Sequence, residues 1–355
     1  GAAAEGVARL ARGEAAELSQ LMLTPANARR LAERLSQMRG AVMKVGQLMS
    51  MDGHGLLPPQ FAELLGGLRD RAHVMPATQL IEVLEREYGS GWHARFRRFS
   101  FEPVAAASIG QVHRAETPDG RVLALKIQYP GVRQSIDSDV ANLGLLARLP
   151  TPGPARPDPT PMLERIRMQL HRETDYAAEA ASLTAYREAL GDDPVLTVPQ
   201  VQADYCTATI LATDFATGIA IDRLADPAQP RAHRDHVAAA LTRLSVREFF
   251  EMRLVQTDPN FGNYLFDADS GRIALIDFGA TEVVSPRLVE QLRSLGRALR
   301  DGDAARIRAM SIDIGFIAEG DPPAQTQGIL DIMRLASEPL RHAGPYDFAA
   351  SDLFK

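Results

Sequence analysis

Hydrophobic and polar positions alternate from Val104 to Lys126 and again over residues 198–217, as they do in strands that bury one face. In the first stretch the aliphatic positions are Leu123, Leu125 and Ile127, and they alternate with Val122, Ala124 and Lys126. Successive side chains of a strand point to opposite faces, so Lys126 is expected on the face away from the aliphatic core. The Asp119–Gly120 pair predicts a hairpin turn before the last strand.

Helical periodicity dominates residues 1–100 and is clearest from about Pro25 to Met51. One side of this segment is an apolar stripe, formed by Leu31, Leu35, Met38, Val42, Val45 and Met49. Lys44 and Gln47 project from nearly the opposite side, among methionines and Gly40. Because a solvent-facing lysine rarely has such neighbours, we expect the helix to be covered on two sides, with Lys44 and Gln47 reaching a polar site. The alternative is a lysine that snorkels from an amphipathic helix.

A proline-rich stretch over residues 150–161 predicts a surface connection, and a long helix is expected from about Pro161 to Leu190. This helix carries Glu173, Asp175 and Glu179. Asp175 and Glu179 are four residues apart and share a face, whereas Glu173 points roughly the other way. A solvated acidic face is the ordinary interpretation of each of these carboxylates.

The chain has 355 residues, of which 45% are hydrophobic and 24% charged, enough for two domains with separate cores. Its formal net charge of -6, without an array of basic and aromatic residues, argues against a nucleic-acid partner. The single cysteine, Cys206, excludes an internal disulfide framework and fits a reducing compartment. No apolar run approaches the roughly 18 residues that span a bilayer, and no signal-peptide pattern opens the chain. We therefore expect any membrane contact to be peripheral or to lie outside this sequence.

Two motifs at protein-kinase spacing lie in the first alternating stretch. Residues 105–112 match the phosphate-covering loop G-x-G-x-x-G-x-V, with alanine at the first two glycine positions. Lys126 stands where that fold keeps the lysine that binds nucleotide phosphates. Only three of the 39 basic residues are lysines, so Lys126 and Lys44 are expected to be needed as lysines; an ordinary edge-strand lysine is the alternative for Lys126. A helix carboxylate must hold this lysine, and the pattern leaves Glu179 and Glu173 both open.

Further along the chain, Asp258 and Asn263 have the D-x-x-x-x-N spacing of a kinase catalytic loop. A hairpin expected from Tyr264 to Ile276 then leads to the tripeptide Asp277-Phe278-Gly279. Asn263 and Asp277 would bind magnesium through hard oxygen ligands, with Asp258 near the transferred group. Each motif is weak alone, but their order along about 175 residues indicates a kinase-like nucleotide site.

With these motifs in place, the chain from about Ala28 to Lys355 resembles the UbiB family of atypical protein-kinase-like proteins, in the branch of the coenzyme Q biosynthesis members. The family marks are a K-x-G-Q motif, an alanine-rich loop and an E-x-D motif. They stand here as Lys44-Val45-Gly46-Gln47, Ala105-Ala106-Ala107-Ser108 and Glu173-Thr174-Asp175. Ordinary kinases lack all three marks, so the resemblance is specific.

The resemblance implies an α+β, two-lobed protein-kinase-like fold with a helical N-terminal extension packed over the active site. The extension corresponds to residues 1–100, the N-lobe with its inserted acidic helix to 101–217, and the C-lobe to 218–355. The nucleotide-binding residues implied by the resemblance are Ala105, Ala106, Ala107, Ser108, Lys126 and Glu179, with Glu179 pairing with Lys126. A regulatory gate is implied by Lys44, Gln47, Glu173 and Asp175. The metal ligands and the catalytic residues remain those of the kinase motifs: Asn263, Asp277, Asp258 and Lys126.

The first functional expectation is an ATPase or atypical kinase that uses ATP and Mg²⁺. The resemblance adds a role in ubiquinone biosynthesis at a membrane surface, in the cytoplasm or an organelle matrix, with anionic lipid, quinone-precursor lipids and ubiquinone-biosynthesis enzymes as partners. The alternatives are a nucleotide-sensing scaffold that organises lipid-modifying enzymes and a small-molecule or prenyl-lipid kinase. A conventional protein kinase comes third, because residues 280–285 leave no room for a long activation segment before the next helix.

Overall fold

The computed structural model describes residues 74–147, 158–257, 259–348 and 350–351. The helix expected over Pro25–Met51, with Lys44 and Gln47, lies outside the described residues, and so does Asp258. The chain divides into two compact units. Of the described residues, the first unit contains those up to Asp222 together with Asn260–Ala280, and the second contains those from Arg223 to Pro259 and from Thr281 onward.

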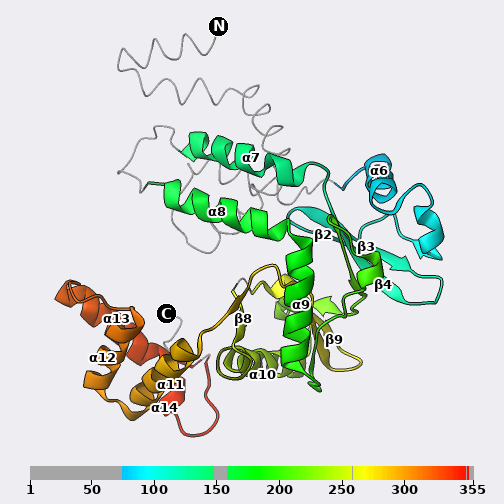
Figure 1. Ribbon diagram of the computed structural model, residues 1–355. Coiled ribbons are helices and arrows are strands. Elements are labelled where there is room, and N and C mark those ends of the chain that lie inside the picture. The colour runs from blue at the N-terminus through cyan, green and yellow to red at the C-terminus, as the bar shows by residue number, and fades with distance from the viewer. Residues whose placement is uncertain (1–73, 148–157, 258, 349, 352–355) are drawn as a thin grey trace, which may run out of the picture. The chain divides into compact units, whose positions relative to one another are not determined.

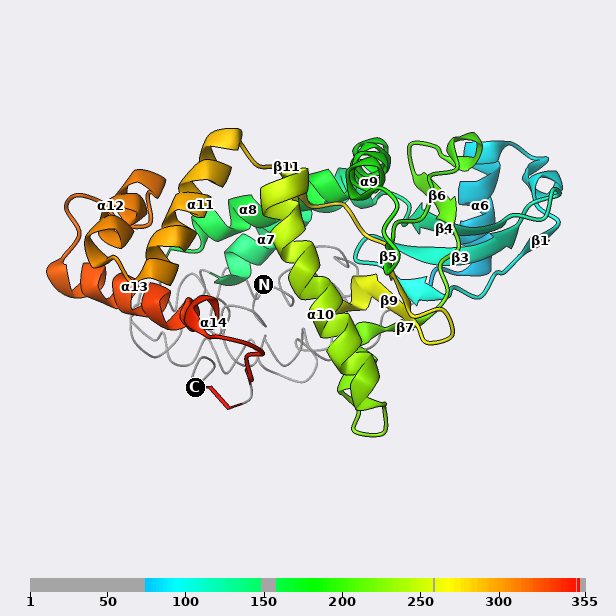
Figure 2. The ribbon, with the colours of Figure 1, turned by 90° about the horizontal axis from the view of Figure 1, so that it is seen from below.

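The first unit is built on an antiparallel sheet with the strand order β1-β3-β4-β6; Figure 1 labels β3 and β4, and Figure 2 labels all four strands. Its strands are β1 (Arg98–Phe99), β3 (Gly110–Glu116), β4 (Val122–Gln128) and β6 (Ile210–Asp214), and the short strand β2 (Ala105–Ala106) pairs with β3. The register places Lys126 between Val112 of β3 and Leu211 of β6. The strands and the Asp-Gly turn predicted between Val104 and Lys126 are thus confirmed, with Gly120 at a φ of 89°.

Helix α6 (Ala77–Tyr88) packs on one face of this sheet (Figure 2). Its apolar residues recur at helical spacing, and they meet the aliphatic face of β4 in one core. The fully buried members that α6 and β4 contribute to this core are Leu80, Val83, Leu84, Leu123, Leu125 and Ile127. Because side chains alternate along β4, Lys126 lies on the opposite face, as predicted. Its partner, Glu179, belongs to α9 (Tyr176–Leu190), which therefore lies on the side of the sheet opposite α6.

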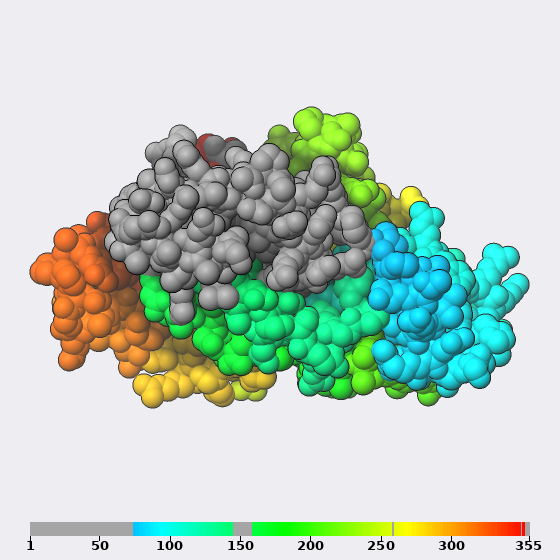
Figure 3. Space-filling model, turned by 90° about the horizontal axis from the view of Figure 1, so that it is seen from above, coloured from blue at the N-terminus to red at the C-terminus, as the bar shows by residue number. Residues whose placement is uncertain are grey.

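Helices α7 (Val132–Ala147) and α8 (Thr160–Glu173) lie side by side (Figures 1 and 3). The single helix predicted over Pro161–Leu190 is wrong, because α8 ends at Glu173 and the chain turns before α9. Asp175 leaves the helical conformation, and its side chain accepts a hydrogen bond of 3.0 Å from the backbone N–H of Ala178. This N-cap starts a new helix, and Figure 1 shows α9 running in a different direction from α8.

A second sheet of the first unit has the strand order β5-β10-β9-β7. Figure 2 labels its strands β5, β9 and β7. Its strands are β5 (Leu196–Thr197), β7 (Ile219–Ala220), β9 (Tyr264–Asp267) and β10 (Arg272–Leu275). Strands β9 and β10 form the predicted hairpin, which turns at Gly271 with a φ of 69° and leads into Asp277. Of the two strands predicted over residues 198–217, only β6 forms, and Val201 makes an isolated bridge with Thr213.

The second unit is mostly helical. Its helices are α10 (Arg231–Arg247), α11 (Pro286–Asp301), α12 (Ala304–Ile314), α13 (Pro323–Ala336) and α14 (Glu338–Arg341), and its strands β8 (Leu254–Gln256) and β11 (Thr281–Val283) pair antiparallel. As predicted, α11 begins directly after Ser285, whose hydroxyl oxygen accepts a bond of 3.2 Å from the Leu288 N–H. Within the ranges that the structure describes, no helix is long and apolar enough to cross a membrane.

Candidate active site

Lys126 and Glu179 form the centre of the candidate site. The Lys126 Nζ lies 2.7 and 2.9 Å from the two carboxylate oxygens of Glu179. Lys126 extends from β4 on the face away from the core, and Glu179 lies in the first turn of α9. Their side chains are 20% and 2% exposed, so the pair is largely shielded from water. The sequence pattern left Glu173 and Glu179 open as partners of the lysine, and the contact is made by Glu179.

One lysine faces more than one carboxylate in this site. Burial alone would lower the pKa of Lys126, but the carboxylates of Asp277 and Glu179 outweigh burial and raise it. Burial raises the pKa of Glu179; Lys126 opposes this rise, and Asp277 adds to it. The Lys126 ammonium also lies over the ring of Tyr176, with Nζ 5.3 Å from the ring centroid. Lys126 is therefore held in its protonated form, and its positive charge stabilises the ionised form of Glu179.

Asn263 and Asp277 meet beside the β9–β10 hairpin. The Asn263 Nδ2 donates to Asp277 Oδ2 over 3.3 Å, and the Gly279 N–H donates to Asp277 Oδ1 over 3.0 Å. A bond of 3.1 Å from the Ile276 N–H to the Asn263 carbonyl holds the two chain segments together. Amide and carboxylate oxygens are the ligands that magnesium prefers, so the donor set of these two residues fits this ion.

Two aromatic side chains connect the Asp-Phe-Gly segment to α9. The Phe278 side chain is 1% exposed, and its ring centroid lies 4.6 Å from that of Tyr186, which is fully buried. Tyr186 follows Glu179 by seven residues, which places both on one side of α9. This packing fixes the helix that carries Glu179 against the segment that carries Asp277. The contact was not predicted from the sequence, although the seven-residue spacing of Glu179 and Tyr186 was a signal that could have indicated it.

The alanine-rich loop consists of β2 and the start of the turn that leads to β3, and it is tied to the end of α8. Ala105 and Ala106 belong to β2, and the Ala107 N–H donates to the Gly110 carbonyl over 2.9 Å. The Ser108 hydroxyl donates to a carboxylate oxygen of Glu173 over 2.6 Å. Glu173 therefore contacts the loop, whereas Glu179 contacts Lys126.

Gly110 is the glycine of the kinase loop pattern that this chain retains. A Cβ at this position would lie 2.2 Å from the carbonyl oxygen of Ile127 in β4. Only glycine allows the two backbones to approach this closely, so the retained glycine is needed for the β3–β4 pairing itself.

The E-x-D residues have structural contacts of their own. Asp175 caps α9, and Gln128, at the end of β4, donates from Nε2 to the carbonyl of the intervening Thr174 over 2.9 Å. Gln128 is buried and was not singled out from the sequence, although it lies on the same face of β4 as Lys126. Lys44 and Gln47 are outside the described residues, so the gate that they were expected to form with Glu173 and Asp175 stays a prediction. The same holds for the role of Asp258.

The chain is similar to known proteins over most of its length. A family model described as the ABC1 atypical kinase-like domain matches residues 67–311. The mitochondrial atypical kinase COQ8B of Rattus norvegicus is 36% identical over 336 residues, which are 95% of this chain and 63% of that protein. The mitochondrial atypical kinase COQ8 of Saccharomyces cerevisiae is 33% identical over 342 residues, which are 96% of this chain and 68% of that protein. The chain therefore spans less than two thirds of the length of the rat relative.

Solved structures include a similar chain. The structure of the Rv3197–erythromycin complex from Mycobacterium tuberculosis matches with a TM-score of 0.63 and 28% sequence identity. The match covers 91% of this chain and 81% of that one.

Proposed function

Because this chain belongs to the ABC1 atypical kinase-like family, as its UbiB motifs predicted, we propose that it binds Mg-ATP and releases or transfers the γ-phosphate. The predicted α+β kinase-like fold is confirmed by the family match and by the similar mycobacterial structure. The observation that carries the functional proposal is the contact of Lys126 with both oxygens of Glu179. A strand lysine held by a helix carboxylate, with hard oxygen ligands nearby, is the arrangement that kinase-type phosphoryl transfer uses.

In this proposal each side chain has one task. Lys126 contacts the phosphates, and Glu179 keeps the ammonium group directed toward them. Asn263 and Asp277 hold magnesium, which neutralises phosphate charge when it is bound. The alanine-rich loop covers the phosphates from the side of β2 and β3. Asp258 orients the attacking group, an assignment that its D-x-x-x-x-N spacing with Asn263 supports.

We further propose that this activity supports ubiquinone biosynthesis at a membrane surface, in the cytoplasm or an organelle matrix. The support is the resemblance to the coenzyme Q branch and the names of the relatives, which are mitochondrial atypical kinases COQ8 and COQ8B. Anionic lipid, quinone-precursor lipids and enzymes of ubiquinone biosynthesis are the partners that this role implies. The phosphoryl acceptor in a kinase version of the proposal would be a small molecule or prenyl lipid.

One observation favours a second candidate, a nucleotide-sensing scaffold with little turnover. The alanine-rich loop is paired with β3 through β2, and the Ser108–Glu173 bond tethers it at its other end. Alanine is also stiffer than the glycines it replaces, so the loop has little freedom to close over phosphates. A scaffold requires tight nucleotide binding that changes partner affinity while phosphate release stays negligible.

Phosphate release from Mg-ATP, measured with and without anionic liposomes, distinguishes the two candidates. The ATPase proposal expects release by the parent chain, stimulation by the liposomes and loss of release in Asp277→Asn. The matched control is Asp204→Asn, which neutralises an exposed carboxylate elsewhere in the first unit and should keep the parent rate. Equal release by Asp277→Asn and the parent would overturn the proposal. No release by the parent, together with thermal stabilisation by Mg-ATP, would support the scaffold.

A further inference from the structure

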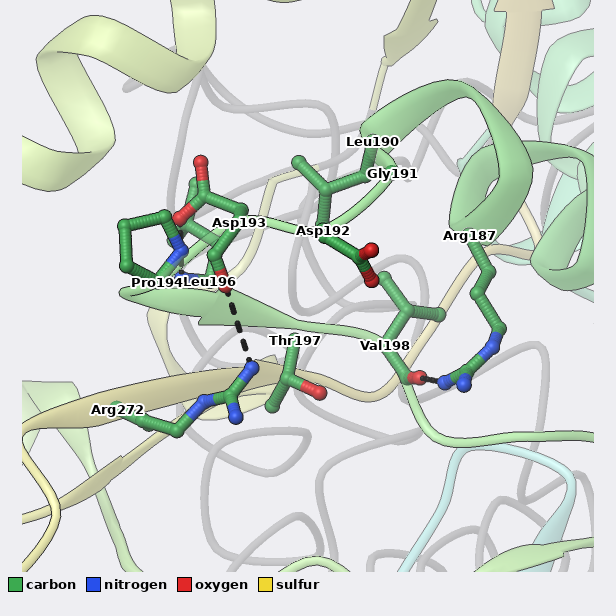
Figure 4. Close-up of a pocket in the computed structure, with 10 residues that line it drawn as sticks. All are labelled: Arg187, Leu190, Gly191, Asp192, Asp193, Pro194, Leu196, Thr197, Val198 and Arg272. Carbon is green, nitrogen blue, oxygen red and sulfur yellow. Dashed lines mark hydrogen bonds between the residues drawn. The ribbon is translucent and has the colours of Figure 1, made fainter.

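A cavity of about 420 Å³ opens in the first unit among the end of α9, the α9–β5 connection, β5 and β10 (Figure 4). A second cavity of about 250 Å³ adjoins it and shares Arg187, Thr197, Val198 and Arg272 with its wall. We call the two together the α9–β10 cavity. Its wall contains none of the residues assigned to the candidate active site. The volume of the larger part lies within the range of about 300–1,000 Å³ that is typical of small-molecule sites.

Two arginines from separate elements line both parts of this cavity. Arg187, on α9, donates from Nη1 to the carbonyl of Val198, and Arg272, on β10, donates from Nη2 to the carbonyl of Asp193 over 3.3 Å (Figure 4). Among the described residues neither guanidinium group forms an ion pair within 4.0 Å. A guanidinium has five N–H donors, so each arginine keeps most of its donors for another acceptor.

A hydroxyl and an apolar wall complete the lining. The Thr197 side chain lies between the two guanidinium groups in Figure 4, and in the described part of the chain its hydroxyl forms no hydrogen bond. Leu190, Pro194 and Leu196 supply apolar surface on the larger side of the cavity. Two guanidinium groups and a hydroxyl are donors that suit a phosphate group, and the apolar wall suits a short organic body.

The carboxylates around the cavity are largely occupied by other donors. Asp193 Oδ1 accepts from the N–H groups of Val195 and Leu196 over 2.8 and 2.7 Å. Asp214 accepts from the Gln202 amide over 2.8 Å. Asp267 accepts from the Ser270 hydroxyl, also over 2.8 Å. Asp192 is the remaining carboxylate of the wall, and Figure 4 shows it projecting toward Val198 without a bond to either arginine. Among the described residues, none of these carboxylates forms an ion pair with Arg187 or Arg272. Neutral donors leave the carboxylate charges in place, so a phosphate would be held by direct bonds to the guanidinium groups and not by a net positive wall.

We propose that the α9–β10 cavity binds a small organic phosphate, with the phosphate group bonded to Arg187, Arg272 and Thr197. Planar guanidinium groups bind phosphate through paired N–H donors, and a hydroxyl adds a third contact. The body of the ligand lies on the apolar wall. Binding in this cavity requires no nucleotide and no catalytic step.

Such a ligand would connect two elements that the candidate active site depends on. Arg187 follows Glu179 by eight residues on α9, and Arg272 precedes Asp277 by five residues on β10 and its extension. A phosphate that bonds both arginines holds the end of α9 to β10, alongside the Tyr186–Phe278 contact. We therefore expect the ligand and Mg-ADP to strengthen each other's binding, by the same factor in either order of addition. This coupling rests on the proposed function, whereas the phosphate site itself does not.

Isothermal titration calorimetry with glycerol 3-phosphate, at constant ionic strength and without nucleotide or magnesium, tests the site directly. We expect saturable binding by the parent chain, and losses of about tenfold or more in Arg187→Gln and in Arg272→Gln, because each removes a charge-assisted hydrogen bond. Thr197→Val should weaken binding by a smaller factor of about three to ten. The matched control is Arg133→Gln, which removes an exposed arginine of α7 and should bind as the parent does. The unfolding midpoint of each variant, followed by Trp92 fluorescence, checks that the first unit is intact.

Absence of saturable binding by the parent, or equal affinity in the parent and both arginine variants, would overturn the site. Propyl phosphate has the same carbon skeleton without the two hydroxyl groups and should bind more tightly than inorganic phosphate; equal affinity for the two would overturn the role of the apolar wall. A second titration with saturating Mg-ADP tests the coupling. If glycerol 3-phosphate binds through the arginines but phosphate release from Mg-ATP is absent, the site stands and the ATPase proposal alone is refuted.

Discussion

Removing the positive charge at the candidate site should be far more damaging than removing one negative charge. In Lys126→Met the cation disappears, and Glu179, whose side chain is 2% exposed, is left buried near Asp277. Losing one partner of a buried ion pair costs about 3–5 kcal/mol. Uptake of a proton by Glu179 moderates this cost, so we expect a loss of about 3 kcal/mol in the free energy of unfolding.

Glu179→Gln is expected to keep the free energy of unfolding within about 1 kcal/mol of the parent value. Lys126 retains Asp277 as a counter-charge. A buried neutral amide also lacks the desolvation cost of a buried carboxylate. Burial raises the pKa of Glu179 above its ordinary 4.5. Below pH 4.5, protonated Glu179 therefore contributes its full stabilisation to the folded state. This effect is lost as the pH rises through the folded-state pKa. The Glu179→Gln variant should therefore gain stability relative to the parent as the pH is raised from 4.5 to 7.

Urea unfolding followed by tryptophan fluorescence compares the free energies of unfolding of Lys126→Met and Glu179→Gln. The signal comes from the first unit, which contains both residues. Trp92 is the single tryptophan and is 8% exposed in the core of the first unit, together with α6 and β4. With a urea dependence of about 1–3 kcal/mol per molar, the Lys126→Met loss lowers the midpoint by about 1 M or more. Equal losses of more than about 2 kcal/mol in both variants would refute the reasoning, since Glu179 would then be the main counter-charge of the lysine.

Two further predictions concern residues around this site. Tyr176→Phe should leave the free energy of unfolding unchanged or raise it by up to about 1 kcal/mol, because the Tyr176 hydroxyl is buried and, among the described residues, has no hydrogen-bond partner. The same urea titration checks this, and a loss above about 1 kcal/mol would show that the hydroxyl is bonded in solution. Gly110→Ala should cost about 3 kcal/mol or more, because its Cβ would meet the Ile127 carbonyl oxygen at 2.2 Å. An unchanged urea midpoint for that variant would mean that β3 and β4 separate at this point without penalty.

Local patterns were sufficient to predict the parts of the fold that depend on neighbouring residues. Alternation along β4 placed Lys126 opposite the aliphatic core, because the two-residue period of a strand leaves no other choice. Turn residues placed the β9–β10 hairpin and therefore the position of Asp277. The serine before Pro286 marked the start of α11.

Contacts between distant segments could not be obtained in the same way. The periodicity of residues 161–190 continues through Thr174, and the break arises because the Asp175 side chain binds the Ala178 N–H instead of continuing the helix. The choice between Glu173 and Glu179 depends on how α9 is placed against β4. That placement involves the Gln128–Thr174 bond, a contact between segments 46 residues apart. The periodicity of a sequence does not report contacts between distant segments. Only the family resemblance favoured Glu179 as the partner of Lys126.

The short connection after Asp-Phe-Gly limits how this chain can be regulated by covalent modification. Between Gly279 and Pro286 the hydroxyl side chains are those of Thr281 and Ser285. Thr281 is paired with Gln256 in the β8–β11 ladder, so a phosphate there has no loose segment to order. Ser285 precedes α11, where a helix N-terminus already accommodates negative charge. A phosphorylated activation loop of the usual kind therefore has no segment to order between the Asp-Phe-Gly tripeptide and α11.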